Sequence, residues 1–314
     1  MIRQPHTRSE GTRFIRVPVR RMWLLVPVFA LMLLVVGAAV AGAQQPGVLD
    51  AATLSYKRAS FTWMDRLHPF AMRIFALVSG IGFALAGLRW ILSKDELDDV
   101  AIQFVRRFAF ISFWFTIMFS WEMWIPAFLD VFTAAGISAS GRATLNPSEI
   151  VGIGTDLQSA IGISAVDFFV NPLAGATIQF AGLLVLLAYV IAAVAVSYTL
   201  IQSYLVMGAG VLFLGFAGWE STAQLTDNYL NLLTYIGIKV MVLFLLVGLG
   251  TEVAGEMVRA TAAMRWSDMS PAGEILFSSF LFASLVLGLP VMFASRITQG
   301  QHFGLVSAVR AKAS

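Results

Sequence analysis

The sequence lacks cysteine altogether and is poor in charge. Its 314 residues contain no cysteine, three histidines and only 12% charged side chains. The absence of cysteine excludes thiolate nucleophiles, thiolate metal ligands, iron–sulfur clusters and disulfide bonds. A soluble globular domain carries about 25% charged residues, so half that amount excludes an ordinary water-soluble domain, and the apolar content excludes disorder.

Signatures of metal-dependent and nucleotide-dependent chemistry are missing as well. His6, His68 and His302 lie far apart, and no HExxH, GxxxxGK[ST] or complete GxGxxG sequence occurs. The segment from Gly152 to Asp156 (GIGTD) only approximates the GxGD sequence of intramembrane proteases, and a second membrane aspartate to match it is missing. We therefore expect no enzymatic activity, no catalytic or metal-binding residues and no cofactor.

Long apolar stretches are what the chain does contain. Apolar side chains make up 58% of the residues, and the mean hydropathy is +0.80. This composition predicts an all-α polytopic membrane protein. The net charge of +3 does not indicate nucleic-acid binding, because residues 1–43 hold six arginines and one acid and leave −2 for residues 44–314.

The first 43 residues have the features of a secretory signal peptide. An arginine pair precedes an apolar stretch over 22–41, which ends in a small-residue cleavage site after Ala43. An uncleaved first span is the alternative, because the apolar stretch is long at about 20 residues. In both cases residues 44–69 emerge outside the cytoplasm, where their mixed basic and apolar spacing suits a short helix on the membrane surface.

Residues 70–132 are expected to form a first pair of membrane helices. The apolar runs over about 70–92 and 108–132 predict the two spans. Arg106 and Arg107 place the connection between these spans in the cytoplasm.

Residues 133–172 follow as an extracytoplasmic loop. Within this loop, the segment Asn146 to Glu149 predicts the start of a helix, with proline at its first position. That helix is expected to be amphipathic, because four apolar residues recur at helical spacing, namely Ile150, Ile153, Leu157 and Ile161.

Residues 173–295 form the core membrane domain of this prediction. The nearly uninterrupted apolar stretch over 173–218 would be roughly 69 Å long as one helix, about twice the hydrocarbon thickness of a bilayer. We therefore expect the chain to fold back where Gln202 and the glycines at 208, 210, 215 and 218 mark the run, with a short re-entrant or broken helix over 205–218. Further spans are expected at about 231–252 and 274–294, because both segments are apolar.

The basic tail, residues 296–314, favours five spans over six. Five crossings that start outside place this tail in the cytoplasm, as the distribution of basic residues in membrane proteins favours. Counting 205–218 as a sixth span would place the tail outside. Arg259 and Arg265 count against the five-span topology, because it puts them outside.

Three charged residues inside predicted spans are candidates for channel or gating roles. Lys239 lies about eight residues into its span, where a charge is costly; it either serves a function or extends to the nearer membrane face. Glu122 and Asp130 lie eight residues apart on one helical face. They either line a hydrated path or pair with a basic residue, or interfacial solvation explains them.

Glycines and one tryptophan complete the candidate set. Gly208, Gly210 and Gly215 permit close helix packing or a chain reversal, and a gate built at this point would need the same residues. Trp219 lies near the end of a predicted span, as aromatic residues of the membrane interface commonly do.

Several segments together resemble one family of membrane proteins. These segments are, in order, Ser120 to Asp130 (SWEMWIPAFLD), Leu145 to Ile150 (LNPSEI), Met207 to Gly218 (MGAGVLFLGFAG), Tyr235 to Val240 (YIGIKV) and Gly248 to Gly250. Their order and spacing over roughly residues 45–295 resemble the TrbL/VirB6 family, inner-membrane subunits of type IV secretion systems. The chain departs from the family at Glu220, where relatives commonly have an arginine cluster.

The resemblance implies a function and a set of partners. It implies a homo-oligomeric ring in the bacterial inner membrane, with residues 44–69 and 133–172 in the periplasm. The implied partners are secretion ATPases, VirB8-like and VirB10-like subunits and the pilin, with Trp219 as a contact to this machinery. The implied work is passage of single-stranded DNA with its relaxase, and pilus biogenesis. Because the predicted spans contain few basic residues, we expect this chain to act as a scaffold around a conduit formed between chains.

An autonomous small-solute transporter or ion channel is the alternative function. Transporters often contain paired repeats with a broken helix in each half. Here only 205–218 is a candidate broken helix, with no counterpart near 70–130. This asymmetry favours the secretion subunit.

Overall fold

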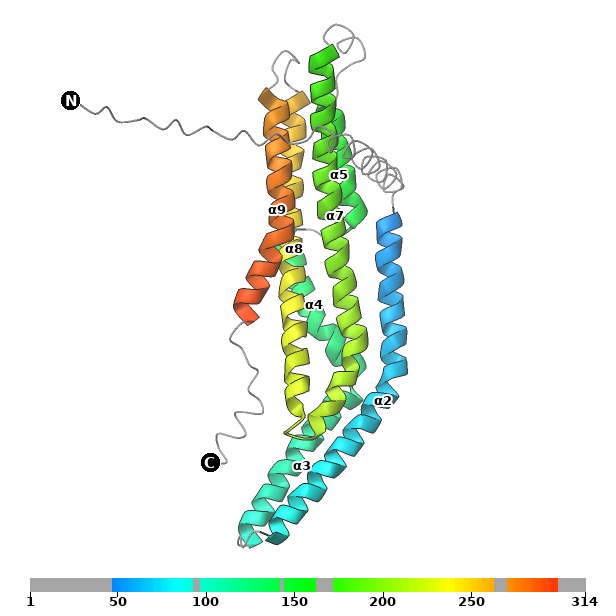
Figure 1. The fold of residues 1–314 in the computed structure, drawn as a ribbon, viewed down its shortest axis with the longest axis vertical. Helices are drawn as coiled ribbons and strands as arrows, with labels where there is room; N and C mark the ends of the chain where they lie inside the picture. The colour runs from blue at the N-terminus through cyan, green and yellow to red at the C-terminus, as the bar shows by residue number, and fades with distance from the viewer. Residues whose placement is uncertain (1–46, 93–96, 142–143, 162–171, 263–269, 299–314) are drawn as a thin grey trace, which may run out of the picture. The chain divides into compact units, whose positions relative to one another are not determined.

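The computed structural model describes residues 47–92, 97–141, 144–161, 172–262 and 270–298, and the regular structure in these residues is entirely helical (Figure 1). The helices are α2 (Val48–Leu92), α3 (Leu97–Phe119), α4 (Trp121–Ser140), α5 (Pro147–Ile161), α7 (Pro172–Leu214), α8 (Ala223–Ala262) and α9 (Ser270–Thr298), with a 3-10 turn, η1 (Gly215–Gly218). Within these residues, six helices, all except α5, are long and apolar enough to cross a membrane. The prediction of an all-α polytopic membrane protein is confirmed.

The antiparallel hairpin of α7 and α8 is the element on which the other helices pack. Only η1 and a short turn separate its two helices (Figure 1). Helices α2 and α5 lie against α7, α4 lies against α8, and α9 contacts both. One apolar core forms between α5, α7, α8 and α9, and a second between α2, α3, α4 and the C-terminal part of α7.

Close contacts along the helices give their directions. Helix α2 runs parallel to α7, α3 returns antiparallel to α2, and α4 runs parallel to α8. For α2 and α7 the contacts are Ser60 with Gly208 and Ala71 with Gly215. For α2 and α3 they are Trp90 with Gln103 and Phe75 with Phe115. For α4 and α8 they are Phe132 with Gly237 and Ser140 with Gly248. Helices α3 and α4 therefore follow one another in the same direction.

Helix α2 differs from the prediction of a separate surface helix over 44–69. The structure has one helix from Val48 to Leu92, which packs along α7. Pro69 lies inside it and lacks the N–H group that a helix interior normally uses. Met64 and Ala71, on either side of the proline, are fully buried, so packing against the core holds both halves of the helix in place.

The predicted single span over 108–132 is divided at Ser120. Helix α3 ends at Phe119 and α4 begins at Trp121, and Ser120 has φ −101° and ψ 25°, outside the helical region. Pro126 lies inside α4 and cannot donate the hydrogen bond that would continue the helix upstream. Helix α4 ends at Gly141, whose left-handed φ of 67° lets its N–H donate to the Ile137 carbonyl.

The amphipathic helix predicted in the loop is α5, and its boundaries and buried face agree with the sequence pattern. It begins at Pro147 and ends at Ile161, and Ile150, Leu157 and Ile161 are buried against α7 and α8. The Ser148 N–H in its first turn donates to the Asp50 carboxylate at 3.3 Å. That acid compensates an otherwise unpaired N–H group at the helix start.

The predicted chain reversal occurs at the last of its marked positions, Gly215 and Gly218, and not at Gln202. Helix α7 continues without interruption through Gln202, Gly208 and Gly210 to Leu214, and the reversal occurs in η1 and the turn that follows. The separate re-entrant helix over 205–218 is therefore absent, because packing against α2 and α8 retains the helical backbone at the glycines. The 43 residues of α7 measure about 64 Å.

Two predicted segments fall outside the described residues. These are the signal peptide, residues 1–43, and most of the basic tail, of which the structure describes only the end of α9 up to Thr298.

Candidate functional site

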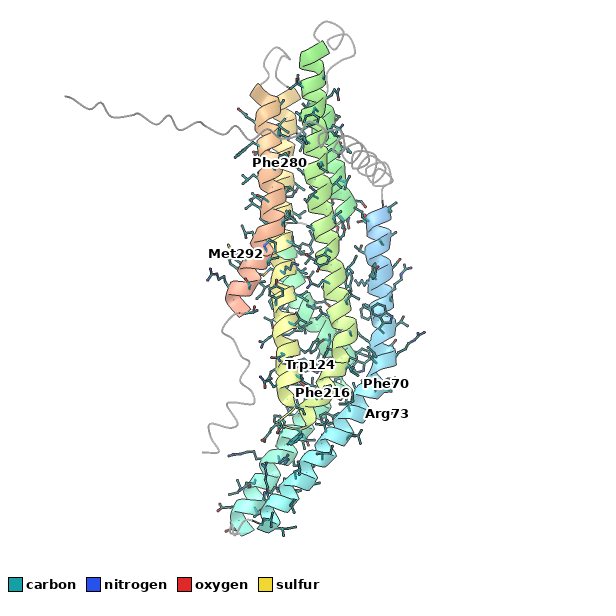
Figure 2. All side chains as sticks on the ribbon, viewed as in Figure 1. Phe70, Arg73, Trp124, Phe216, Phe280 and Met292 are labelled. Carbon is teal, nitrogen blue, oxygen red and sulfur yellow. The ribbon has the colours of Figure 1, made fainter. Side chains whose placement is uncertain are left out.

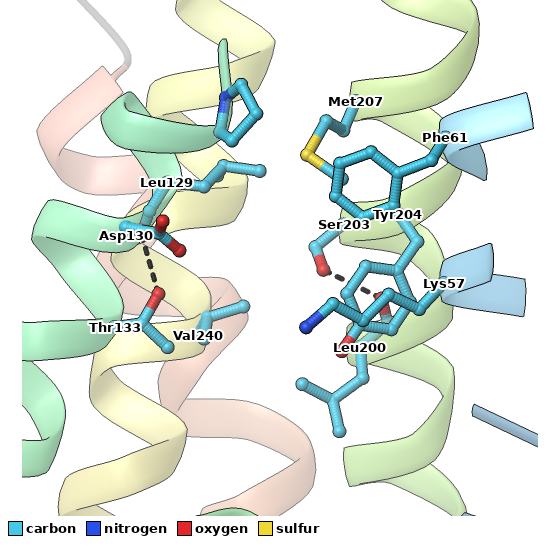
Figure 3. A pocket seen from close by; sticks show the side chains of 11 residues that line it. Lys57, Phe61, Leu129, Asp130, Thr133, Leu200, Ser203, Tyr204, Met207 and Val240 are labelled. Atoms are coloured by element: carbon cyan, nitrogen blue, oxygen red, sulfur yellow. Dashed lines mark hydrogen bonds between the residues drawn. The ribbon is translucent and has the colours of Figure 1, made fainter. Parts of the chain in front are cut away.

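A cavity with a mainly apolar lining and two charged side chains lies where α2, α4, α7 and α8 come together. Its volume is about 190 Å³ (Figure 3). The residues that line it are Lys57, Phe61, Pro126, Leu129, Asp130, Thr133, Leu200, Ser203, Tyr204, Met207 and Val240. A space of this size holds about six water molecules at their liquid volume of about 30 Å³ each.

Two opposite charges face this cavity from different helices. Lys57 comes from α2 and Asp130 from α4, on opposite walls (Figure 3). The hydroxyl groups of Thr133 and Ser203 donate to the carbonyls of Leu129 and Leu200, each at 2.7 Å. Their oxygens remain available as acceptors. The cavity therefore offers a cation, an anion and neutral hydrogen-bond acceptors within a space of about 190 Å³.

Of the two acids predicted on one face of α4, the structure places only Asp130 in this cavity. Glu122 lies in the first turn of α4 with its side chain exposed. Helix α4 separates these two residues by two turns, and the cavity begins at Pro126 on this helix. The two acids therefore do not share one site.

Lys239 lies beside the cavity, buried between α7 and α8. Its side chain is 7% exposed, and its Nζ donates to Gln202 Oε1 at 3.1 Å. The same Nζ lies 5.3 Å from the ring centroid of Tyr198, which is exposed. A neutral amide and an aromatic face thus stabilise this cation in place of a carboxylate. Its role in a channel or gate stays a prediction.

The predicted glycines lie at close helix contacts. A Cβ atom at Gly208 would lie 3.0 Å from the Ser60 carbonyl oxygen, and one at Gly215 would lie 2.7 Å from the Ala71 carbonyl oxygen. Gly210 instead faces the ring of Tyr229. Gly208 brings the backbone of α7 close to that of α2, and Gly215 does the same for η1, as small residues do between membrane helices. A gating role for these glycines stays a prediction.

Trp219 packs within the chain. It is partly buried in the turn after η1, and a Cβ atom at Gly82 of α2 would lie 3.1 Å from its indole ring and 2.9 Å from Arg107 of α3. The tryptophan therefore helps to join the turn to α2 and α3. Its role as a partner contact stays a prediction.

Two buried polar residues escaped the sequence reasoning. Asp227 is 9% exposed, and neither its Oδ1 atom nor the Tyr229 hydroxyl has a hydrogen-bond partner among the described residues. The polar stretch 219–228 reads as a loop in the sequence, but its second half is the start of α8. Asp227 is the fifth residue of α8, beyond the first turn, so no helix-start signal in the sequence identifies it.

No group of three potential metal ligands gathers among the described residues. The charged residues of this region are Lys57, Asp130 and Lys239, each from a different helix. This arrangement can hold water or a small polar group.

Comparison with known proteins identifies the family. The family model described as TrbL/VirB6 plasmid conjugal transfer protein matches residues 79–294. A probable conjugal transfer protein TrbL of Sinorhizobium fredii (strain NBRC 101917 / NGR234) is 26% identical over 223 residues, which are 70% of this chain and 56% of the relative. A conjugal transfer protein TrbL of Rhizobium radiobacter is 24% identical over 264 residues, which are 82% of this chain and 63% of the relative.

The chain thus spans about three fifths of the length of these two relatives. The matched residues 79–294 extend from the second half of α2 to the C-terminal part of α9, and include Asp130, Lys239 and the glycines of α7. The family model covers more than half of the chain, and the resemblance found in the sequence is confirmed. This chain belongs to the TrbL/VirB6 family of plasmid conjugal transfer proteins.

Proposed function

We propose that this protein is an inner-membrane channel or scaffold subunit of a type IV secretion system. In this role it supports conjugative transfer of single-stranded DNA with its relaxase, and pilus biogenesis. The observation that carries the proposal is the family match over residues 79–294, which includes five of the six long apolar helices in full or nearly so.

The helix directions support a topology with five passes. Helices α3 and α4 follow one another in the same direction, so together they make one pass. Helices α2, α7, α8 and α9 make one pass each. An odd number of passes puts the end of α9 on the opposite side from Val48, which agrees with a periplasmic N-terminus and a cytoplasmic basic tail.

The exposed surfaces support a scaffold that touches lipid and other subunits. Large apolar side chains on α3 and α4 are exposed, including Phe113, Phe119, Met123, Trp124 and Val131. In a bilayer such surfaces contact acyl chains or neighbouring helices. The neighbours we propose are further copies in a ring, VirB8-like and VirB10-like subunits, secretion ATPases and the pilin.

Two experiments test this function together. The first deletes the gene from its conjugative element and counts transconjugants, with the wild-type gene returned in trans as the control. We expect transfer to fall to background and to recover with the returned gene. Transfer at the wild-type level without the gene would overturn the proposal.

The second experiment identifies the complex. The tagged protein is purified from its native membrane in mild detergent, and the retained proteins are identified by mass spectrometry. Recovery of a secretion ATPase with VirB8-like and VirB10-like subunits supports the proposal. Recovery of the protein alone, as a small oligomer with saturable solute uptake in vesicles, would assign it to the autonomous transporters.

A further inference from the structure

Three arginines lie along one exposed line of α2. Arg58, Arg66 and Arg73 are separated by eight and seven residues, which at about 100° per residue places them within an arc of about 80° of the helix surface. All three side chains are exposed, and none forms an ion pair with a described acidic side chain. The buried residues of this part of α2 lie on the other side, namely Thr53, Ser60, Met64, Ala71 and Phe75. The line of arginines spans about 22 Å along the helix.

Three exposed aromatic rings lie beside these arginines. Tyr56 is 44% exposed, Trp63 37% and Phe70 56%, at intervals of seven residues. The Arg73 guanidinium lies 5.8 Å from the ring centroid of Phe70 (Figure 2). We call the six residues, Tyr56, Arg58, Trp63, Arg66, Phe70 and Arg73, the α2 stripe. Basic and aromatic side chains alternate along it.

The α2 stripe is unsuited to lipid acyl chains. An arginine at the centre of a bilayer costs about 2.5–3.5 kcal/mol on insertion scales, and α2 carries three on one face beside the apolar helix α7. An aromatic belt at the membrane interface would gather at one depth. The α2 stripe instead extends about 25 Å along the helix axis from Tyr56 to Arg73. It therefore faces an aqueous space, such as one enclosed by several subunits.

The charges on this face favour an anionic partner. Between residues 51 and 80 the acidic side chain is Asp65, against Lys57 and the three arginines of the α2 stripe. Lys57 faces the cavity, and Asp65 is exposed seven residues after Arg58, so the outer face carries the three arginines against one acid. A groove of basic groups with aromatic rings on which bases stack is the general mode of binding for single-stranded nucleic acid.

We infer that the α2 stripe binds single-stranded nucleic acid, with the arginines on phosphates and the aromatic rings against bases. The inference rests on the proposed function and names the surface that touches the transferred strand. A length of about 22 Å accommodates roughly six stacked nucleotides at about 3.4 Å each, which lies within the site sizes of single-strand binding proteins.

The first experiment measures DNA binding by the full chain in nanodiscs of zwitterionic lipid. Fluorescence anisotropy of a labelled oligothymidylate is followed over a series of salt concentrations. Each phosphate contact on a single strand contributes about −0.7 to the slope of log K against log salt, so R58Q/R66Q/R73Q should flatten the slope by about two. The matched control is R89Q/R106Q/R259Q, which removes three exposed arginines elsewhere and should keep the wild-type slope.

The second experiment separates stacking from charge. W63A/F70A should weaken DNA binding about thirtyfold or more with an unchanged salt slope, because each of the two lost stacks is worth at least about fivefold. W124A/F280A removes exposed rings from α4 and α9 and should bind as the wild type (Figure 2). R58K/R66K/R73K keeps the charge and should retain the slope, and size-exclusion elution and thermal melting confirm that each variant is folded.

Three results would overturn the inference. One is DNA binding by R58Q/R66Q/R73Q that equals the wild type. Another is unchanged DNA binding together with loss of co-purified anionic lipid, which would assign the arginines to phospholipid headgroups. A third is full conjugative transfer by R58Q/R66Q/R73Q in a deletion strain that the wild-type gene restores. If the deletion strain transfers normally, the proposed function fails, and the binding assay then judges the α2 stripe alone.

Discussion

The contact between Lys239 and Gln202 permits a quantitative test of how this hairpin tolerates a buried charge. Gln202→Leu removes the acceptor for the Lys239 ammonium, which is 7% exposed and donates at 3.1 Å. Hydrogen bonds between membrane helices average about 0.6 kcal/mol, whereas a charged donor left without an acceptor costs about 1–3 kcal/mol or more. We expect a destabilisation of about 1–3 kcal/mol, since the contacts of this cation in the described part of the chain are with an amide and an aromatic ring and include no carboxylate that could replace the amide.

The opposite substitution should behave differently. Lys239→Met keeps most of the side-chain volume and removes the charge, so the only cost is the lost donor to the neutral amide oxygen of the partly exposed Gln202. We expect a change within about 0.5 kcal/mol, or a gain, as when a buried ion is replaced by an apolar side chain of similar size. The double variant should resemble Lys239→Met, which gives a coupling energy of about 1–3 kcal/mol.

The assay is thermal unfolding of the purified protein in mild detergent. At this chain length a change of 1 kcal/mol shifts the midpoint by roughly 1.5 °C. Gln179→Leu, an exposed glutamine of the same helix, is the matched control and should not shift it. Equal destabilisation by Gln202→Leu and Lys239→Met, or additive effects in the double variant, would refute the reasoning, because the contact would then have no special dependence on the charge.

Three further substitutions test the packing and the cavity. Gly215→Ala should destabilise the contact of η1 with α2 by about 1–3 kcal/mol in the same melting assay. Gly87→Ala, with open space around the new Cβ atom, should be neutral or stabilising, and equal effects of the two substitutions would contradict the close contact at Gly215. Asp130→Cys, in a chain without cysteine, should react with a water-soluble maleimide, as detected by mass spectrometry. Ser279→Cys, at a position that is 1% exposed, should not react, and an unreactive cysteine at position 130 would show that the cavity is dry. Asp227→Asn should leave the unfolding midpoint unchanged or raise it, since the Oδ1 atom lacks a partner, and a fall equivalent to more than about 1 kcal/mol would reveal a charged partner.

The sequence predicted those elements whose signals are local. The start of α5 at Pro147 and its apolar face are readable because proline at the first helical position and a 3.6-residue period are local properties. The membrane class follows from composition alone. Asp130 was identified as a charge in an apolar context, and the structure places it at the cavity.

The errors arose where tertiary contacts override local signals. Glycines and Gln202 in an apolar stretch read as a break, but in the structure Gln202 pairs with Lys239 and Gly208 contacts the α2 backbone, so α7 stays helical at both positions. Pro69 likewise reads as a boundary, yet burial on both sides keeps α2 continuous. The α2 stripe was missed for a related reason, because a segment assigned to the membrane surface gives no indication of which face packs against α7.

The uninterrupted length of α7 has a mechanical consequence. Helices α7 and α8, with 43 and 40 residues, are each about twice as long as the hydrocarbon core is thick. A substantial part of this hairpin must therefore project into water, and α7 contains no proline or hinge between its ends that would let the projecting part bend freely. A tilt imposed on the projecting end would rotate the membrane-embedded end by the same angle. A partner that bound the projecting end of this hairpin and tilted it would therefore also shift the helix contacts at the membrane-embedded end.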